Sequence, residues 1–224
     1  MNERLLGILV DSFPKILMAG VKVTIPLTVI AFSAAMVIAV VVALIQFANI
    51  PVAKQVCRFY IWVFRGTPLL VQLFVVFFGF PDLGITLKPF TAAAIVFALN
   101  EGAYAAEIVR AALEAVPAGQ LEAGYCVGMN YLQIMRRIIL PQAMRTAVPS
   151  LANSLISMLK DTSLAFSIAL VEMFATTKQI AANNWIVLPL YLEVGFIYLM
   201  MSTVLTFVQQ RLEKKLSSYG NQRG

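Results

Sequence analysis

Histidine is absent from this chain, and cysteine occurs only at Cys57 and Cys126. Two cysteines so far apart in the sequence, with no histidine to join them, give little support for a metal cluster or a disulfide framework. The sequence also lacks the G-x-x-x-x-G-K-[S/T] loop that cradles nucleotide phosphates, so it cannot hold ATP by that route. No nucleophile is visibly paired with a base, and serine without a base is a poor nucleophile. We therefore expect no catalytic site and no bound metal.

Charged residues are scarce as well. They make up 12% of the chain, while 60% of the residues are hydrophobic; soluble domains carry about 25% charged residues. Residues 23–53 contain no Asp, Glu, Lys or Arg, and about 20 apolar residues suffice to cross a bilayer. The first residues, with Glu3 and Asp11, lack the basic start and clean apolar core of a cleavable signal peptide, so none is expected. These features predict an all-α integral membrane protein.

Hydropathy divides the chain into about five expected membrane-spanning helices. They cover roughly residues 17–46, 59–80, 89–113, 142–162 and 187–210. The apolar part of residues 163–186 is too short to span, and fits a surface helix or a re-entrant segment. Because no internal repeat or low-complexity linker is visible, residues 1–224 are expected to form a single transmembrane domain.

The distribution of Lys and Arg predicts the orientation. An odd number of spans places the two termini on opposite sides of the membrane. With the C-terminus inside, eleven of the 17 basic residues fall on the cytoplasmic side, which favours an outside N-terminus and a cytoplasmic segment at about 114–141. The net charge of +6 fits this bias. Since the bases are scattered and no soluble domain is present, nucleic acid is not an expected partner.

Polar side chains near the middle of three expected spans predict a cavity. Such groups are costly at that depth, about 2.5–3.5 kcal/mol for a central Asp, and normally face a bundle interior or a wet cavity. Ser150, Ser154, Ser157 and Asp161 recur at helical spacing along one face of the fourth span. Hydrogen bonding between helices, with no ligand present, stays open as the alternative for each residue. The candidate substrate ligands are Gln72, Asn100, Tyr104, Asn153, Ser154 and Ser157.

Charged residues close to these positions have other expected roles. We interpret Glu101 as structural, because its carboxylate would repel that of an anionic or zwitterionic substrate. Lys160 and Asp161, near the outer end of the fourth span, are expected to contribute to an external gate or to extend toward the membrane surface. Glu107 and Arg110 are three residues apart on a helix and are expected to pair.

Residues 121–141 concentrate polar and basic side chains between apolar spans. Pro117 and Gly119 are expected to break the chain, and a helix restarting at Gln120 would place Glu122 in a first turn, where a carboxylate interacts favourably with the helix dipole. Gly128 fits a sharp turn between two short helices.

Beyond this turn, the apolar residues have helical spacing. Met135, Ile138 and Ile139 are expected to pack on the membrane domain and to leave Arg136 and Arg137 toward water. A solvated connector with a positive-inside pair of arginines is the simpler interpretation of this segment.

The spacing of Glu122-Ala123, Gly128 and Leu140-Pro141 resembles the EAA loop of ATP-binding-cassette (ABC) importer permeases. Gly124 replaces the third residue of that motif and leaves the spacing intact. The resemblance implies a type I ABC importer permease fold, in which this loop forms a coupling helix that inserts into a cleft on a separate ATPase subunit. It assigns ATPase coupling to Glu122, Ala123, Gly128, Arg136, Arg137 and Pro141.

Three other segments resemble the polar-amino-acid branch of this family: Phe64–Gln72 (FRGTPLLVQ), Leu99–Tyr104 (LNEGAY) and Lys160–Leu164 (KDTSL). The resemblance covers about residues 15–215 and implies import of a polar L-amino acid. In relatives that bind cationic amino acids, a Gly-Asn-Glu sequence places a carboxylate in the fourth span, where this chain has Ala152-Asn153-Ser154. With the neutral Ser154, the sequence looks most like permeases for L-cystine. Glutamine would suit the same hydroxyls and amides.

The resemblance also implies the partners. A dimer of separate ATP-binding subunits would bind ATP and Mg, while this chain would carry no cofactor and catalyse no reaction. A second permease subunit, favoured as an identical copy with a paralogue as the alternative, and an extracellular or periplasmic solute-binding protein would complete a multi-pass assembly in a bacterial cell membrane. The rival class is a stand-alone ion-coupled carrier or channel that uses Glu101 or Asp161. A membrane-embedded enzyme ranks third, because no catalytic constellation is visible.

Overall fold

The computed structural model describes residues 3–48 and 50–218, with side chains as far as residue 214. Every regular element in this part of the chain is helical. The elements are α1 (Glu3–Ala19), η1 (Gly20–Thr24), α2 (Ile25–Phe47), α3 (Pro51–Gly66), α4 (Leu69–Phe74), η2 (Val75–Gly79), η3 (Phe80–Leu83), α5 (Pro89–Glu114), α6 (Ala118–Cys126), α7 (Tyr131–Ile134), η4 (Met135–Ile139), α8 (Leu140–Asp161), η5 (Thr162–Ile168), α9 (Met173–Asn184) and α10 (Leu188–Ser218). The predicted all-α fold is confirmed.

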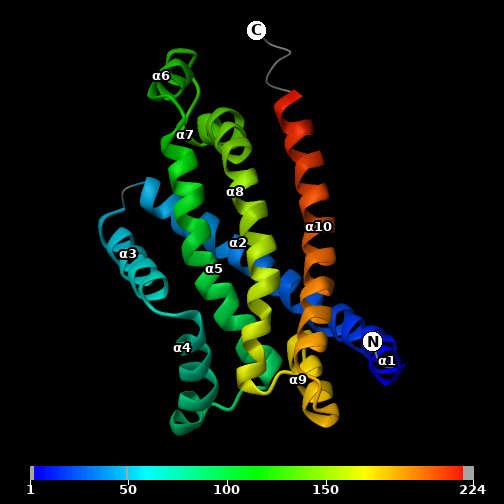
Figure 1. Cartoon of the computed structure of the whole chain (residues 1–224). Helices are drawn as coiled ribbons and strands as arrows, with labels where there is room; N and C mark the ends of the chain where they lie inside the picture. The colour runs from blue at the N-terminus through cyan, green and yellow to red at the C-terminus, as the bar shows by residue number, and fades with distance from the viewer. Residues whose placement is uncertain (1–2, 49, 219–224) are drawn as a thin grey trace.

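Three of the expected spans are long, unbroken helices. α1, η1 and α2 form one apolar helix of 45 residues, and α5 and α10 are the other two. At about 1.5 Å per residue the first helix is roughly twice as long as the hydrocarbon core is thick. It crosses obliquely behind α5, α8 and α10 (Figure 1). The helix begins well before residue 17, where the first span was expected to start.

The other two spans are bent. The helical segment Pro51–Gly66 meets Leu69–Leu83 at 103°. Thr67 is extended, with φ −120° and ψ 144°, because the ring of Pro68 disfavours helical geometry in the residue before it. The span expected over residues 59–80 is therefore bent: the chain turns at Gly66–Pro68. Counting each bent pair as one span gives up to five spans in the described chain, as predicted.

The second bend resolves the ambiguous segment at residues 163–186. A long helical stretch, Tyr131–Ile168, meets Met173–Asn184 at 54°, so the segment contains the end of one limb of a bent pair and the whole of the other. Glu172 holds the bend. Its buried carboxylate accepts hydrogen bonds from the backbone N–H groups of Phe174 (2.8 Å) and Ala175 (2.7 Å) and from the Tyr198 hydroxyl (3.1 Å). The sequence analysis missed this role of Glu172.

Small residues bring α2 and α5 together. Ala31, Ala35, Ala39 and Ala43 recur every four residues along α2, and all four are fully buried. α5 contributes Gly102 and several buried alanines, and the two helices share the most extensive contact in the described chain. Close packing of small residues is the usual way in which membrane helices associate, because lipid offers no hydrophobic driving force between them.

Gly102 offers a test of this packing. A Cβ atom there would lie 2.9 Å from the Tyr60 hydroxyl and 3.0 Å from Ile38 Cγ2. Gly102→Ala should therefore lower the midpoint of thermal unfolding in detergent, since overpacking a well-packed site costs about 1–3 kcal/mol. Gly195→Ala in α10 is the matched control: no atom lies within 4 Å of its Cβ position, so its midpoint should stay equal or rise. Equal midpoints for both variants would contradict the close approach of α2, α3 and α5.

Candidate functional site

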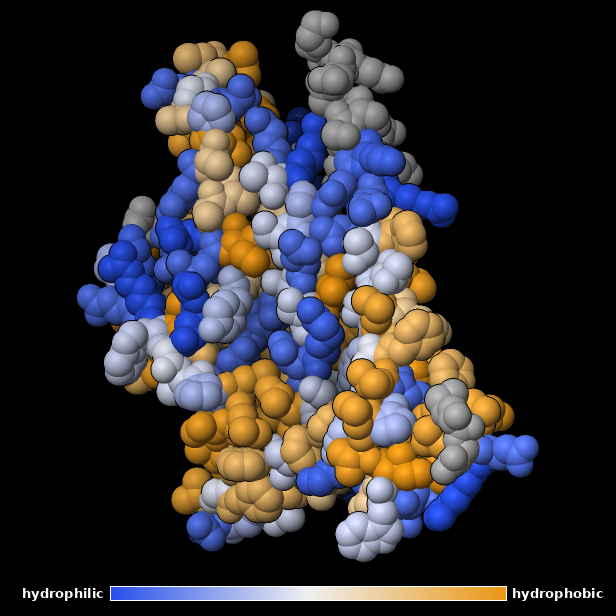
Figure 2. Space-filling view, viewed as in Figure 1, coloured by the Kyte–Doolittle hydropathy of each residue, from blue (hydrophilic) through white to orange (hydrophobic). Residues whose placement is uncertain are grey.

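A cavity of about 1000 Å³ opens between the α3–α4 bend, α5 and α8. The bend supplies residues 65–69, α5 supplies one face of its middle and C-terminal half, and α8 supplies a stripe of hydroxyls, one amide and one carboxylate. Its lining residues are Arg65, Gly66, Thr67, Pro68, Leu69, Asn100, Glu101, Tyr104, Glu107, Ile108, Arg110, Ala111, Ser150, Asn153, Ser154, Ser157, Asp161 and Leu164. Figure 2 shows hydrophilic side chains gathered over the middle of α5 and α8, above a mainly apolar lower part.

The structure brings most of the predicted pocket residues together. Five of the six predicted substrate ligands line the cavity: Asn100, Tyr104, Asn153, Ser154 and Ser157. Ser150 and two of the three predicted gate or structural residues, Glu101 and Asp161, line it as well. Two predicted residues lie elsewhere. Gln72 sits behind the lining, and Lys160 is exposed beside Tyr191 and Tyr198, in a separate surface depression.

Gln72 instead stabilises the α3–α4 bend. Its side-chain NH₂ group donates to the Phe64 carbonyl (2.9 Å), to the Thr67 carbonyl (3.1 Å) and to the Thr67 hydroxyl (2.8 Å). Asn100 of α5 donates to the same Phe64 carbonyl and to Gln72 Oε1, both at 3.1 Å. These amides satisfy carbonyl groups that the break at Pro68 leaves without helical partners. Gln72 as a substrate ligand stays a prediction.

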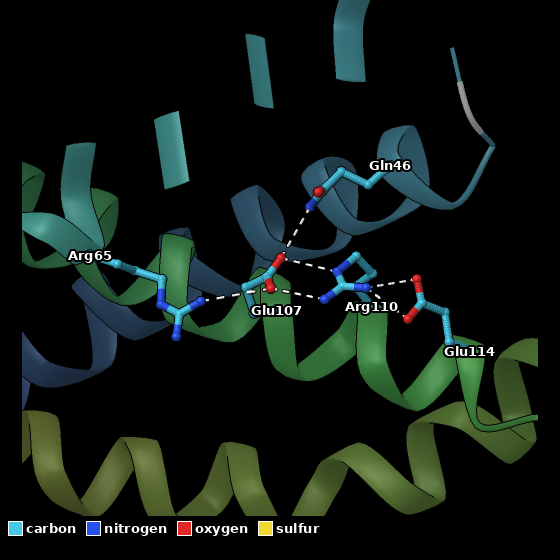
Figure 3. Close-up of polar contacts among 5 residues, drawn as sticks. All are labelled: Gln46, Arg65, Glu107, Arg110 and Glu114. Atoms are coloured by element: carbon cyan, nitrogen blue, oxygen red, sulfur yellow. Dashed lines mark hydrogen bonds and ion pairs between the residues drawn. The ribbon is translucent and has the colours of Figure 1, made fainter. Parts of the chain in front are cut away.

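A charged network includes three of the lining residues, Arg65, Glu107 and Arg110 (Figure 3). Arg110 binds Glu107 through Nη2 at 2.9 Å and Glu114 through Nη1 at 2.7 Å, which confirms the predicted pair of Glu107 and Arg110. Arg65 Nη1 lies 3.7 Å from Glu107 Oε2, and Gln46 donates to Glu107 Oε1 at 3.5 Å. One carboxylate thus joins side chains from α2, α3 and α5.

Arg65 lines the cavity but was not among the residues predicted for it. The structure places its guanidinium 5.2 Å from the centre of the Tyr104 ring, within cation–π range. The signal was present in the sequence: Gly66 and Pro68 follow directly, and together they turn the chain back toward α5. No group of three or more Cys, Asp or Glu side chains close enough to hold a metal ion occurs among the described residues.

The loop between α5 and α8 is a short helical hairpin. α6 and α7 are joined at Gly128, whose φ of +77° confirms the predicted sharp turn. Asn130 caps α7: its side chain accepts from the Gln133 N–H, and the Gln133 side chain accepts from the Asn130 N–H, both at 2.9 Å. Helix α6 begins at Ala118, so Glu122 lies in its second turn. The expected first-turn position of Glu122 is therefore wrong.

Gly124, the departure from the EAA pattern, packs against Ile134 of α7. A Cβ atom at residue 124 would lie 2.6 Å from Ile134 Cγ1, a distance that real Cβ atoms do not adopt. Alanine at this position would force the two short helices apart. The glycine therefore permits the close approach that folds the hairpin.

All six residues predicted to contact an ATPase are exposed, five of them on this loop and Pro141 in the first turn of α8: Glu122, Ala123, Gly128, Arg136, Arg137 and Pro141. Met135 and Ile139 are buried and Ile138 is partly buried against the membrane domain, as predicted. Three apolar side chains also stand exposed around the turn. Tyr125, Val127 and Leu132 keep 51%, 74% and 75% of their surface accessible.

Comparison with known proteins identifies the family. The family described as "Binding-protein-dependent transport system inner membrane component" matches residues 35–218. This chain belongs to that family. Its match runs from α2 to the end of α10 and includes the cavity and the hairpin loop. A family member of this kind is a multi-pass component of the inner membrane and a transport subunit rather than an enzyme.

Individual members of the binding-protein-dependent family are similar over nearly the whole chain. The L-cystine transport system permease protein TcyB of Bacillus subtilis (strain 168) is 44% identical over 210 residues, 93% of this chain and 90% of TcyB. The L-cystine transport system permease protein TcyL of the same organism is 37% identical, covering 93% of this chain and 90% of TcyL. The crystal structure of an amino acid ABC transporter with histidines superposes with a TM-score of 0.88 at 31% identity, over 96% of this chain and 100% of that chain. The fold is that of a type I ABC importer permease.

The hydrogen bonds that Gln72 makes at the α3–α4 bend predict that replacing this residue lowers thermal stability. Gln72→Met removes the amide that hydrogen-bonds to the Phe64 and Thr67 carbonyls and accepts from Asn100, so the midpoint of thermal unfolding in detergent should fall; each lost hydrogen bond costs about 0.5–1.5 kcal/mol. Gln179→Met, at an exposed position on α9, is the matched control and should leave the midpoint unchanged. An unchanged midpoint for Gln72→Met together with lost substrate binding would make Gln72 a ligand instead.

Proposed function

We propose that this chain is the permease subunit of an ATP-driven importer for a polar L-amino acid, with L-cystine as the best candidate. The observation that carries this proposal is the pairing of a polar cavity inside the helix bundle with an exposed hairpin loop at one end of the helices that line it. The 44% identity to an L-cystine transport permease protein supports the same function.

The chemistry of the α8 stripe favours a substrate without a charged side chain. Asn153, Ser154 and Ser157 present one amide and two hydroxyls to the cavity. Cystine carries no net side-chain charge, so such groups suit its disulfide-linked halves, and Ser154 offers no carboxylate to a cationic side chain. Glutamine is the second candidate, because its amide would be hydrogen-bonded equally well by the same groups.

A second permease subunit is proposed because the cavity is open on one side. Asn153, Ser157 and Asp161 are exposed along one stripe of α8, within a bent span. Lipid cannot satisfy these polar groups, and a charged side chain in the hydrocarbon core is costly. Another protein surface must cover the stripe, and an identical copy of this chain is favoured over a paralogue.

The hairpin loop is the proposed contact with the ATPase. Val127 and Leu132 are largely exposed near its turn, and Glu122 of the same hairpin is exposed as well. Exposed apolar side chains grouped with charged ones are typical of protein–protein contacts. ATP and Mg would be held by a separate dimer of ATPase subunits, each receiving one loop.

The proposed orientation places the loop in the cytoplasm, with the N-terminus outside and the C-terminus inside a bacterial cell membrane. In this orientation α6, α7 and the C-terminal end of α10 lie on one side of the molecule (Figure 1). An extracellular or periplasmic solute-binding protein would deliver the amino acid to the opposite face. ATP binding would draw the two loops together and turn the cavity from inward to outward access, and hydrolysis would reset it.

The turn at Gly128 tests the role of the loop. No atom lies within 4 Å of a Cβ placed there, so only the positive φ restricts substitution. Gly128→Val should distort the hairpin, since this conformation costs about 1–3 kcal/mol in a residue that does not favour it. We expect the variant to reach the membrane but to lose ATPase co-purification and ATP-dependent L-cystine uptake.

Gly128→Asn is the matched control, because asparagine tolerates the left-handed conformation. It should keep most co-purification and uptake. If both variants keep the ATPase and full uptake, the loop is not the coupling element. Uptake by the purified permease alone, without an ATPase, would favour the ion-coupled carrier.

The two native cysteines test the orientation. Cys126 is exposed on the loop, whereas Cys57 is buried. A membrane-impermeant maleimide should label the protein in inside-out vesicles and not in intact spheroplasts, and Cys126→Ser should abolish the label. Added ATPase subunit should reduce labelling in the vesicles. Labelling in intact spheroplasts would place the loop outside and exclude contact with a cytoplasmic ATPase.

A further inference from the structure

Glu101 stands apart from the other carboxylates of the membrane helices. It lies near the middle of α5 and lines the cavity. Its Oε1 atom is buried and has no hydrogen-bond partner within the part of the chain that the structure describes. Ser154 of α8 lines the same cavity and lies near the carboxyl group.

Three other glutamates of the helices have hydrogen-bond or ion-pair partners. Glu107 is bound by Arg110, Glu172 accepts two backbone N–H groups and a hydroxyl, and Glu193 accepts from Ser12. A buried carboxylate oxygen without a donor is costly, more so than a neutral acceptor. Glu101 is therefore a group that gains from a cationic donor, and its place in the cavity lining puts the carboxyl group beside a space that such a donor can enter.

The other charged groups around Glu101 also favour a cation beside it. Asp161 of α8 lines the same cavity and repels the Glu101 carboxylate, so the two acids favour a cation between the helices. The cavity's arginines do not neutralise them. Arg110 is bound to Glu107 and Glu114, and Arg65 lies against Glu107 and the Tyr104 ring.

We infer that Glu101 receives the α-ammonium group of the transported amino acid. This inference rests on the proposed function. An ammonium group supplies three N–H donors, enough for Oε1 and for the neighbouring Asp161. Tyr104 follows Glu101 by three residues, a rise of about 4.5 Å along the helix. The Arg65 guanidinium lies over the Tyr104 ring. The cavity thus has an acidic part and a basic part at the spacing of adjacent helical turns, which complements a zwitterion.

This role replaces the expectation that Glu101 is structural. The repulsion between Glu101 and a substrate carboxylate, on which that expectation depended, is avoided when the amino acid enters with its ammonium group toward Glu101. Recognition of the α-ammonium would be shared by all amino acids, so Glu101 selects for the free amino group, while Ser154 and Ser157 contact the side chain.

The test measures binding to the purified permease–ATPase complex without the solute-binding protein. Radiolabelled L-cystine and L-glutamine serve as separate probes, displaced by unlabelled L-glutamine or N-acetyl-L-glutamine. Wild type should prefer the free amine over the acetylated competitor by at least tenfold. Glu101→Gln should weaken probe binding at least tenfold and reduce that preference to less than threefold. Glu101→Asp, which keeps the charge, should retain the preference.

Glu193→Gln is the matched control, because its amide oxygen can still accept from Ser12 and the residue lies outside the cavity. It should bind like wild type. If Glu101→Gln keeps the preference for the free amine, the inference is overturned and the proposed function stays intact. The same holds if the variant loses thermal stability without a change in that preference. If Glu101→Gln fails to assemble, the test uses Glu101→Asp. An assembled Glu101→Asp that binds with normal affinity and still prefers the free amine would support the inference. Loss of that preference would overturn it. If wild type binds neither probe, the proposed substrate fails and the inference falls with it.

Discussion

The Glu107 carboxylate is the interaction on which the arrangement of the cavity depends. Gln46 reaches it from α2, Arg65 from α3 and Arg110 from its own helix. Removing it would leave two arginines facing each other at the end of the cavity. Arg110 also binds Glu114, three residues before Pro117, where the chain leaves α5 for the loop. The wall of the cavity and the base of the loop are therefore held by one network (Figure 3).

The α3–α4 bend shows how a membrane protein accommodates an interrupted helix. Pro68 prevents the chain from continuing as a helix, so the Phe64 carbonyl loses its normal partner. In water such a group would be hydrated, but within a bilayer only the protein can satisfy it. Gln72 and Asn100 do so from two different helices. The same bend brings Arg65 to the cavity, so the interruption both requires amides and positions a charge.

The sequence predicted features that depend on local spacing. The all-α class, the turn at Gly128 and the polar stripe of α8 follow from periodicity and from single-residue conformational preferences. The bends did not follow from the hydropathy pattern, because hydropathy is averaged over a window that is longer than the break at Gly66–Pro68. Glu172 was missed because glutamate is a weak indicator of a helix start. The interpretation of Gln72 failed to anticipate the bend, because an amide within a span is compatible with a ligand or with a structural hydrogen bond.

One helical stretch connects the hairpin loop to the cavity, and it determines how a movement of the loop can reach the cavity. α7, η4, α8 and η5 form a helical stretch from Tyr131 to Ile168 without a sharp break. Its first turns pack on α6 through Gly124 and Ile134, and its middle carries Ser154 and Ser157. A hairpin locked by the close approach at Gly124 has little internal freedom to absorb a push from a docked partner. We therefore expect a displacement of the loop to reach the cavity as a movement of α8 as a whole, which shifts Ser154 and Ser157 relative to Glu101 of α5.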